Sequence, residues 1–189
     1  MIPLVPPVVS GLPAQQPQLT AGELLLRPWQ PTDAGALLTA YADPAIQRWH
    51  VETIDVAGAA RYAQVWADAW LAGQRAGWAV VDRGALVGRT TLRGIDLEQG
   101  QGELTYWVVP AARGRGVAPS AAEALVAWAF ALGFRRLTLN HSTLNGASCR
   151  VADKLGFTLE GTRRSAGLHI DGWHDMHLHA RLSQDRPTG

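Results

Sequence analysis

Two arginines alternate with two glycines at Arg113-Gly114-Arg115-Gly116, between an apolar run ending at Val109 and an alanine-rich segment of helical period. The first amides of a helix lack partners within the helix and carry its positive dipole end. Glycines let such a backbone approach an anion closely, and arginine pairs well with phosphate oxygens. This order of strand, loop and helix predicts a pyrophosphate site. The alternative is an exposed turn with solvated arginines.

The elements that would position this loop alternate between strand and helix patterns. Strands are expected at 23–29, 77–82, 85–95, 102–110, 135–141 and as two strands within 157–182, with turns at 82–84 and 171–172. Helices are expected from Thr32 or Asp33 to Asp43 and over 56–73, 118–133 and 145–156. This order predicts a mixed α/β (α+β) fold, in which helices flank a mostly antiparallel central sheet.

Composition excludes several classes of protein. The 189 residues suit one domain, and the net charge of +1 gives no bulk attraction to nucleic acid or to an anionic membrane. No apolar run reaches the roughly 18 residues that a membrane span needs. Cys149 is the one cysteine, so no internal disulfide forms, and a reducing, cytoplasmic compartment is expected.

The ends of the chain differ from its middle. Five prolines fall within residues 1–20, which predicts an extended, mobile arm, with partner binding as the alternative. That segment has no basic stretch before an apolar one, so no secretory signal is expected. A single domain is expected over 21–184, followed by a tail over 185–189.

The loop and its surroundings resemble a known family. The string Arg113-Gly114-Arg115-Gly116-Val117-Ala118 resembles the Q/R-x-x-G-x-G/A signature of the GNAT superfamily of N-acetyltransferases. The strings "LLLRPW", "GELTYWVVPAARGRG", "NGASCRVADKLGF" and "LEGTRR" occur in the order typical of the RimJ/RimL-like branch, which includes acetyltransferases of ribosomal-protein N-termini. The resemblance runs from about Glu23 to Leu182. It implies the GNAT fold, with a bulge that splays the fourth expected strand (102–110) from the fifth (135–141).

The resemblance also implies acetyl-CoA as the cosubstrate. In the family, loop amides hold the pyrophosphate, the preceding strand end contacts the pantetheine arm, and a later Asn-x-x-Ser contacts the coenzyme. The corresponding residues here are Trp107, Val108, Val109, Arg113, Gly114, Arg115, Gly116, Val117, Ala118, Asn145 and Ser148.

Acetyl transfer needs a neutral amine, although an α-amine has a pKa of about 8 and lysine one of about 10.4. The resemblance implies that Glu103 binds the amine or acts as general base, whereas a solvated glutamate at a strand end is the structural alternative. Many GNAT enzymes use a helix tyrosine as the acid, but Ala152 stands at that position. Ser148 is the remaining donor toward the thiol, either directly or through a water. Asn145 and Ser148 would otherwise simply cap their helix.

The acceptor side is less defined by sequence. The connection that contains Trp49 and His50 often lines the acceptor pocket in this family, and Glu103 and His141 are further candidates, with Asp43 and Glu52 behind them. The predicted reaction is direct attack by a primary amine in a ternary complex. The amine belongs to a small molecule or to a peptide or protein N-terminus, and the alternative is a silent acyl-CoA-binding module. A monomer or a homodimer is expected.

Histidines gather near the end of the chain, at His169, His174, His177 and His179. His177 and His179 would share one face of a strand, and His174 would not. No recognised Cys/His spacing is present, so no metal is expected. Cys149 follows Ser148 and would point elsewhere on its helix, so a covalent cysteine mechanism is not expected.

Overall fold

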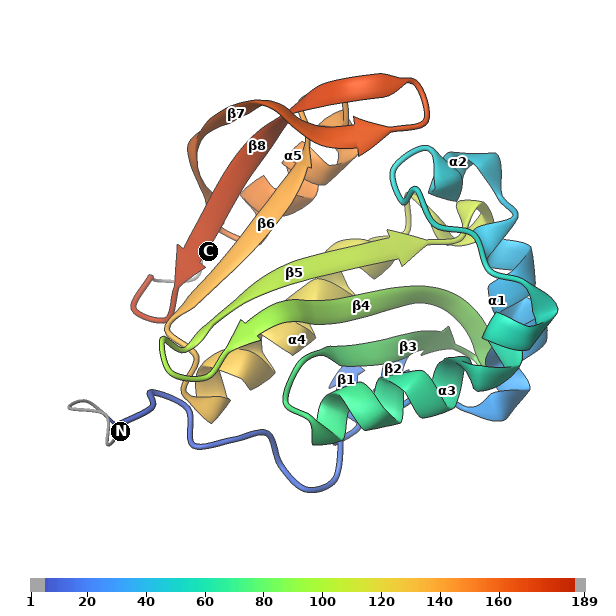
Figure 1. Ribbon diagram of the computed structural model, residues 1–189, viewed down its shortest axis with the longest axis horizontal. Coiled ribbons are helices and arrows are strands. Elements are labelled where there is room, and N and C mark those ends of the chain that lie inside the picture. Colours follow the sequence, from blue (N-terminus) through green and yellow to red (C-terminus); the bar gives the residue numbers. More distant parts are fainter. Residues whose placement is uncertain (1–5, 186–189) are drawn as a thin grey trace.

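A computed structural model describes residues 6–185, which form one eight-stranded sheet with helices on both faces (Figure 1). The strands are β1 (Leu19–Ala21), β2 (Leu24–Arg27), β3 (Ala76–Asp82), β4 (Ala85–Asp96), β5 (Gln101–Val108), β6 (Arg136–Ser142), β7 (Thr158–His169) and β8 (Gly172–Leu182). The helices are η1 (Pro31–Asp33), α1 (Ala34–Tyr41), α2 (Pro44–Gln47), α3 (Val56–Leu71), η2 (Pro110–Ala112), α4 (Val117–Leu132) and α5 (Gly146–Lys154).

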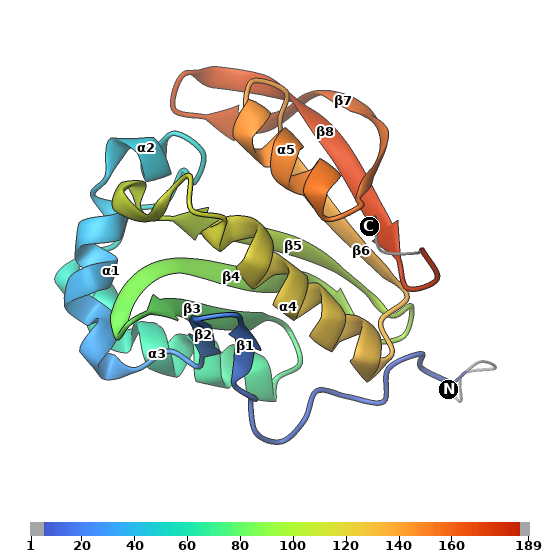
Figure 2. The same ribbon diagram turned by 180° about the vertical axis from the view of Figure 1, so that it is seen from behind.

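The order across the sheet is β1-β2-β3-β4-β5-β6-β8-β7, and every pairing is antiparallel except that of β5 with β6. The helices α4 and α5 lie on one face (Figure 2), and α1 and α3 lie on the other. The mixed, mostly antiparallel fold expected from the sequence is confirmed. Within residues 6–185, none of the helices combines the length and apolar character that crossing a bilayer requires.

The predicted splay lies between β5 and β6. Their parallel pairing is limited to Gln101–Glu103 against Arg136–Thr138, although both strands continue beyond it. On its other side β5 stays in register with β4, from Arg93↔Glu103 to Gly88↔Val108, without a bulge in that stretch. The strands therefore part by divergence, which leaves the β6-facing edge of β5 free beyond Glu103.

Local sequence explains most boundaries. Arg83 and Gly84 have φ values of 49° and 83° in the turn between β3 and β4, and Gly172 has φ 123° between β7 and β8. Both turns were predicted. Asp43 does not simply end a helix: its side chain caps α2 by accepting from the amides of Ala45 and Ile46. The sequence did not predict α2 or the short strand β1.

The start of the chain differs from the mobile arm expected over 1–20. Residues 1–5 lie outside the described residues, as do 186–189 of the expected tail. From residue 6 the chain is extended but packed: Val9 is 2% exposed. The indole nitrogens of Trp70 and Trp78 donate to the carbonyls of Pro13 and Pro17, each at 2.8 Å. These contacts tie the proline-rich segment to the domain.

Candidate active site

The Arg-Gly loop begins α4 at the splayed end of β5. Gly114 and Gly116 have φ values of 75° and 79°, a conformation that disfavours any residue with a Cβ, and Gly116 is the residue preceding the helix. The first amides of α4 therefore point toward the loop without partners inside the helix. The local geometry matches the anion site expected from the sequence.

A cavity of about 350 Å³ adjoins this loop. Its walls come from β5, the loop, the first turn of α4, α5 and the segment around α2. Three cationic side chains, Arg113, Arg150 and Lys154, line it, and among residues 6–185 no carboxylate does. We call it the coenzyme cavity. Its one-sided charge suits a ligand that carries several phosphates.

Most of the residues expected to contact the coenzyme line this cavity. These are Trp107, Val108, Arg113, Gly114, Gly116, Val117, Ala118, Asn145 and Ser148. Val109 and Arg115 do not. The amide of Val109 donates to the carbonyl of Val87 at 2.9 Å, and Arg115 forms an ion pair of 2.6 Å with Asp82. Sequence reasoning missed Arg150 and Lys154, although their spacing places both on the face of α5 that Val151 shares.

A second cavity, of about 320 Å³, lies between β5, β6, the bulged part of β7 and the segment after α2. We call it the acceptor cavity. It contains all four residues expected to bind the acceptor, namely Trp49, His50, Glu103 and His141, and also Glu52. Asp43 does not line it. Arg89, Arg93 and Arg163 add positive charge to its walls.

The two cavities share Trp49, His50, Tyr106, Asn145 and Ser148. The Tyr106 hydroxyl donates to Ser148 Oγ at 3.1 Å. Burial raises the pKa of Tyr106 to about 12, so the phenol keeps its proton at neutral pH. Asn145 Oδ1 accepts from the Ser148 amide at 3.1 Å, which is the capping contact foreseen as the structural alternative. This cap uses the backbone amide of Ser148 and not its hydroxyl, which lies where the two cavities meet.

Glu103 lies at the last paired position of β5 against β6. Arg93 on β4 donates to its carboxylate at 2.7 Å, and the Glu103 side chain is 22% exposed. The sequence placed Glu103 at a strand end in water or in a buried site, and the structure gives a partly buried carboxylate with an arginine partner. The glutamate remains accessible from the acceptor cavity.

His50 is held by β5. Its Nε2 lies 3.0 Å from the carbonyl oxygen of Tyr106, which can only accept, so Nε2 carries the proton. Burial, followed by the nearby Arg89 charge, lowers the pKa of His50 to about 4. The ring is therefore neutral at physiological pH. The His50 ring thus binds the Tyr106 carbonyl, on the edge of β5 that has diverged from β6.

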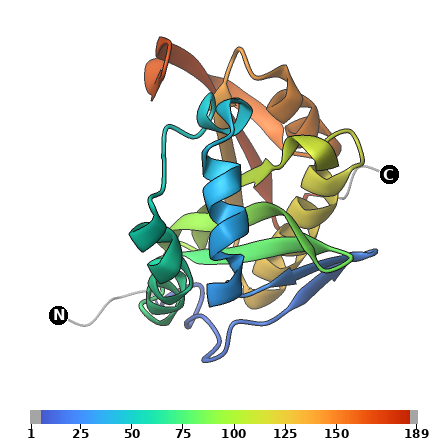
Figure 3. The same ribbon diagram turned by 90° about the vertical axis from the view of Figure 1, so that its right-hand side faces the viewer.

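The segment after α2 also contacts the β7–β8 hairpin, and Figure 3 places the tip of the hairpin next to α2. The ring of Trp49 meets that of His169 at 5.8 Å, edge to face, and His169 Nδ1 lies 3.2 Å from the Arg48 carbonyl oxygen. These contacts form one side of the acceptor cavity. Val51 and Leu168, on its rim, are 56% and 55% exposed.

Comparison with known proteins agrees with this geometry. The family model "Acetyltransferase (GNAT) domain" matches residues 23–158. The Bacillus subtilis protein named "Putative ribosomal N-acetyltransferase YdaF" is 29% identical over 104 residues, covering 54% of this chain and 56% of that protein. The match therefore spans little more than half of that relative.

Solved structures share the fold across nearly the whole chain. Mycobacterium smegmatis RimJ in complex with CoA-disulfide has a TM-score of 0.82 at 22% identity, covering 92% of this chain and 89% of that one. RimL, a ribosomal alpha-N-protein acetyltransferase in complex with coenzyme A, has a TM-score of 0.82 at 20% identity, covering 88% of this chain and 98% of that one. The resemblance seen in the sequence is confirmed at the level of family and fold.

Proposed function

The chain belongs to the GNAT acetyltransferase family, and we propose that it transfers the acetyl group of acetyl-CoA to a primary amine. The observation that carries this proposal is the junction of the two cavities at Tyr106 and Ser148. A thioester in one cavity and an amine in the other would meet there. Both reactants would then be bound together, as direct transfer requires.

The coenzyme cavity supports acetyl-CoA as the donor. The amides at the start of α4 would hold the pyrophosphate, and Arg113, Arg150 and Lys154 would neutralise the phosphate charge. The edge of β5 beyond Glu103 is not paired with β6, so its remaining backbone groups would contact the pantetheine arm. The carbonyls of Tyr106 and Val108 are already taken by His50 and Arg113. Arg115, paired with Asp82, contributes less.

The acceptor cavity supports Glu103 as the group that receives the proton of the incoming ammonium, directly or through a water. The amine nitrogen then attacks the thioester carbonyl, a C–N bond forms and the C–S bond breaks. The Glu103 carboxyl passes the first proton to water, and the nitrogen then releases its second proton to the regenerated carboxylate or directly to water. Arg93, 2.7 Å from the Glu103 carboxylate, fixes the position of that side chain in the acceptor cavity.

The leaving thiolate is supplied with a proton from the other side of the junction. Ser148 donates its hydroxyl proton to sulfur, and Tyr106, which donates to Ser148, replaces it. A serine alone is a poor proton source, and the phenol behind it supplies the acid that Ala152 cannot. Solvent restores the Tyr106 proton.

We propose the N-terminal amine of a peptide or protein as the acceptor. The exposed rim at Val51 and Leu168 leaves room for a chain to continue out of the acceptor cavity. The name of the Bacillus subtilis relative points to the same class. A small amine such as a polyamine would need a more enclosed pocket.

The test uses peptides with a free α-amine, the same peptides with a blocked α-amine, and a set of small amines, each incubated with acetyl-CoA and the full chain. Mass spectrometry locates the added acetyl group. The proposal predicts acetylation of the free α-amine alone. Acetylation of the small amines alone would overturn the acceptor assignment. Coenzyme binding without any product would favour a silent acyl-CoA-binding module.

A further inference from the structure

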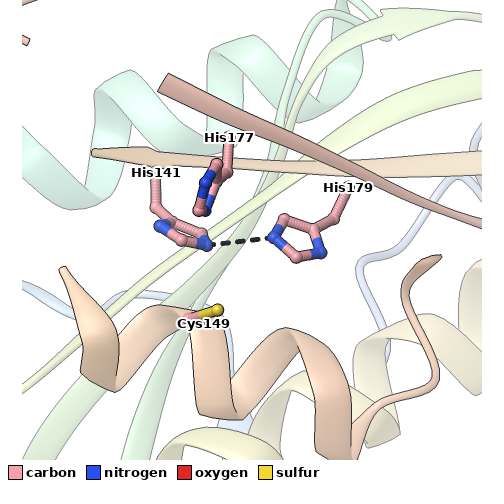
Figure 4. Close-up of side chains that lie close together, drawn as sticks. All are labelled: His141, Cys149, His177 and His179. Atoms are coloured by element: carbon pink, nitrogen blue, oxygen red, sulfur yellow. Dashed lines mark hydrogen bonds between the residues drawn. The ribbon is translucent and has the colours of Figure 1, made fainter. Parts of the chain in front are cut away.

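Four side chains from three elements converge between α5 and the sheet (Figure 4): His141 from β6, His177 and His179 from β8, and Cys149 from α5. His141 pairs directly with His177 in the β6–β8 register, and His179 lies two residues further on the same face. Cys149 closes the group from the helix. One potential ligand atom from each residue lies within 4.8 Å of all the others.

The tautomers of two of these histidines are set by the backbone. His141 Nδ1 lies 2.8 Å from the Ser142 carbonyl oxygen, and His179 Nδ1 lies 3.3 Å from that of Phe157. A carbonyl only accepts, so both Nδ1 atoms carry protons and both Nε2 atoms carry lone pairs. The two Nε2 atoms nevertheless face each other at 3.2 Å. Two lone pairs at this distance repel each other unless a cation, either a proton on one ring or a metal ion, lies between them.

The other two donors lack partners of their own. His177 Nδ1 is buried without a hydrogen-bond partner among the described residues. Cys149 is a free thiol of intermediate burial. Buried polar nitrogens are nearly always bonded, and a ligand held between these residues would give His177 Nδ1 the partner that it lacks among the described residues.

The distance between the Nε2 atoms of His141 and His179 fits a tetrahedral metal ion. Zinc–nitrogen bonds of about 2.0–2.1 Å at tetrahedral angles place two ligand nitrogens about 3.3 Å apart, close to the observed Nε2–Nε2 distance. A carbonyl that accepts the Nδ1–H of each imidazole is also the usual outer partner of metal-bound histidine. The donor set is nitrogen and sulfur, with no oxygen, which disfavours magnesium and calcium.

We propose that His141, Cys149, His177 and His179 bind one Zn²⁺ ion. Four protein ligands leave no open position, so the ion has a structural role. It would join α5 to β6 and β8. Cys149 directly follows Ser148, so the metal would fix the first turn of α5, from which Ser148 reaches the junction of the two cavities. No metal was expected from the sequence, because no familiar Cys/His spacing exists and only the fold brings these residues together.

The first test measures metal in the full chain. The protein is stripped with a chelator and titrated with Zn²⁺ against a competing chromophore, and Tm is recorded with and without the ion. One equivalent bound and a higher Tm are expected. Co²⁺ replaces Zn²⁺ as a spectroscopic probe. A tetrahedral ligand-field spectrum with a thiolate-to-cobalt band is expected from the wild-type chain.

Variants localise the site. Cys149→Ser and His177→Gln should weaken Zn²⁺ binding at least tenfold and reduce the rise in Tm, and Cys149→Ser should remove the thiolate-to-cobalt band. His169→Gln, a histidine outside the cluster, should bind like the wild type. Circular dichroism checks that each variant folds. If a ligand variant does not fold, the cobalt spectrum of the wild-type chain tests the site instead. Absence of stoichiometric binding, an octahedral spectrum, or binding undiminished in both ligand variants would overturn the proposal.

Discussion

The hydroxyl of Tyr106, on β5, donates to Ser148 Oγ, on α5, at a distance of 3.1 Å. This contact joins β5 to α5, two of the elements that line both cavities. It also brings a phenol to a site whose helix carries Ala152 at the position where the family resemblance predicts a tyrosine. We therefore expect Tyr106 and Ser148 to act as a proton relay to the departing thiolate.

The relay predicts the behaviour of Tyr106→Phe. Removing the phenol should lower kcat by about 100-fold, the low end of the contribution of a general acid. KM for acetyl-CoA should stay within about twofold, because the ring still lines the cavity. Ser148→Ala should have a similar effect, and the double variant should be little worse than either single one, because the two groups act as a unit.

Steady-state rates for the four proteins provide the measurement. Additive losses in the double variant would contradict a shared relay, and an unchanged kcat in Tyr106→Phe would remove the phenol from the reaction. The relay also predicts how kcat depends on the acidity of the thiol leaving group. This dependence should be weaker in the wild type than in the variants.

Arg113 and Arg115 form a matched pair for the coenzyme cavity. Arg113 lines the cavity, whereas Arg115 pairs with Asp82. Arg113→Ala should weaken coenzyme A binding by roughly tenfold, in keeping with the loss of one charge-assisted contact. Arg115→Ala should change the affinity by less than about threefold and cost up to about 1 kcal/mol of stability, as for a partly exposed ion pair. Calorimetric titration with coenzyme A measures both, and equal losses would contradict the assignment.

The fold could be predicted because its signals are local. Glycine and aspartate marked the turns at 82–84 and 171–172, and periodicity marked the long helices. The packing of residues 6–20 could not be predicted, because it depends on indoles of Trp70 and Trp78 that are distant in sequence. Proline content alone does not distinguish a packed extended segment from a mobile one.

Glu103 is predicted to accept a proton from the amine. Glu103→Gln keeps the size and one hydrogen bond to Arg93 but removes the base, so kcat should fall by about 100-fold while coenzyme A binding is retained. Glu98→Gln, an exposed carboxylate near the same end of the sheet, is the control and should match the wild type. Initial rates at saturating acetyl-CoA test this. Full activity in Glu103→Gln would reassign Glu103 to structure.

His50 predicts a pH dependence of stability. Its folded pKa of about 4 lies below the value of about 6.5 for an exposed histidine. The unfolded chain therefore binds the proton first as pH falls, so this stabilisation is complete above about pH 6.5 and is lost toward pH 4. The loss between about pH 7 and pH 5 should approach 2 kcal/mol.

Urea unfolding at several pH values measures this loss. His50→Gln can still donate to the Tyr106 carbonyl but does not titrate, so its stability should fall less over the same interval. Parallel pH profiles for the wild type and His50→Gln would show that another group is responsible.

The site was only partly accessible to sequence reasoning. The Arg-Gly loop is one contiguous string, so the coenzyme site could be recognised from it. Tyr106 and Ser148 lie on different elements, and their contact exists only because β5 and β6 diverge beside α5. The direction of the Arg115 side chain likewise depends on Asp82, which lies at the end of β3.

The central claim is that two reactants meet at the Tyr106–Ser148 junction. Free thiol release from acetyl-CoA, measured while acetyl-CoA and an α-amine peptide are both varied, tests it most directly. Direct transfer predicts intersecting double-reciprocal lines and no thiol release without the peptide. Parallel lines would indicate an acetylated enzyme and contradict direct attack, and tight coenzyme binding with no thiol release for any amine would contradict the acetyltransferase activity itself.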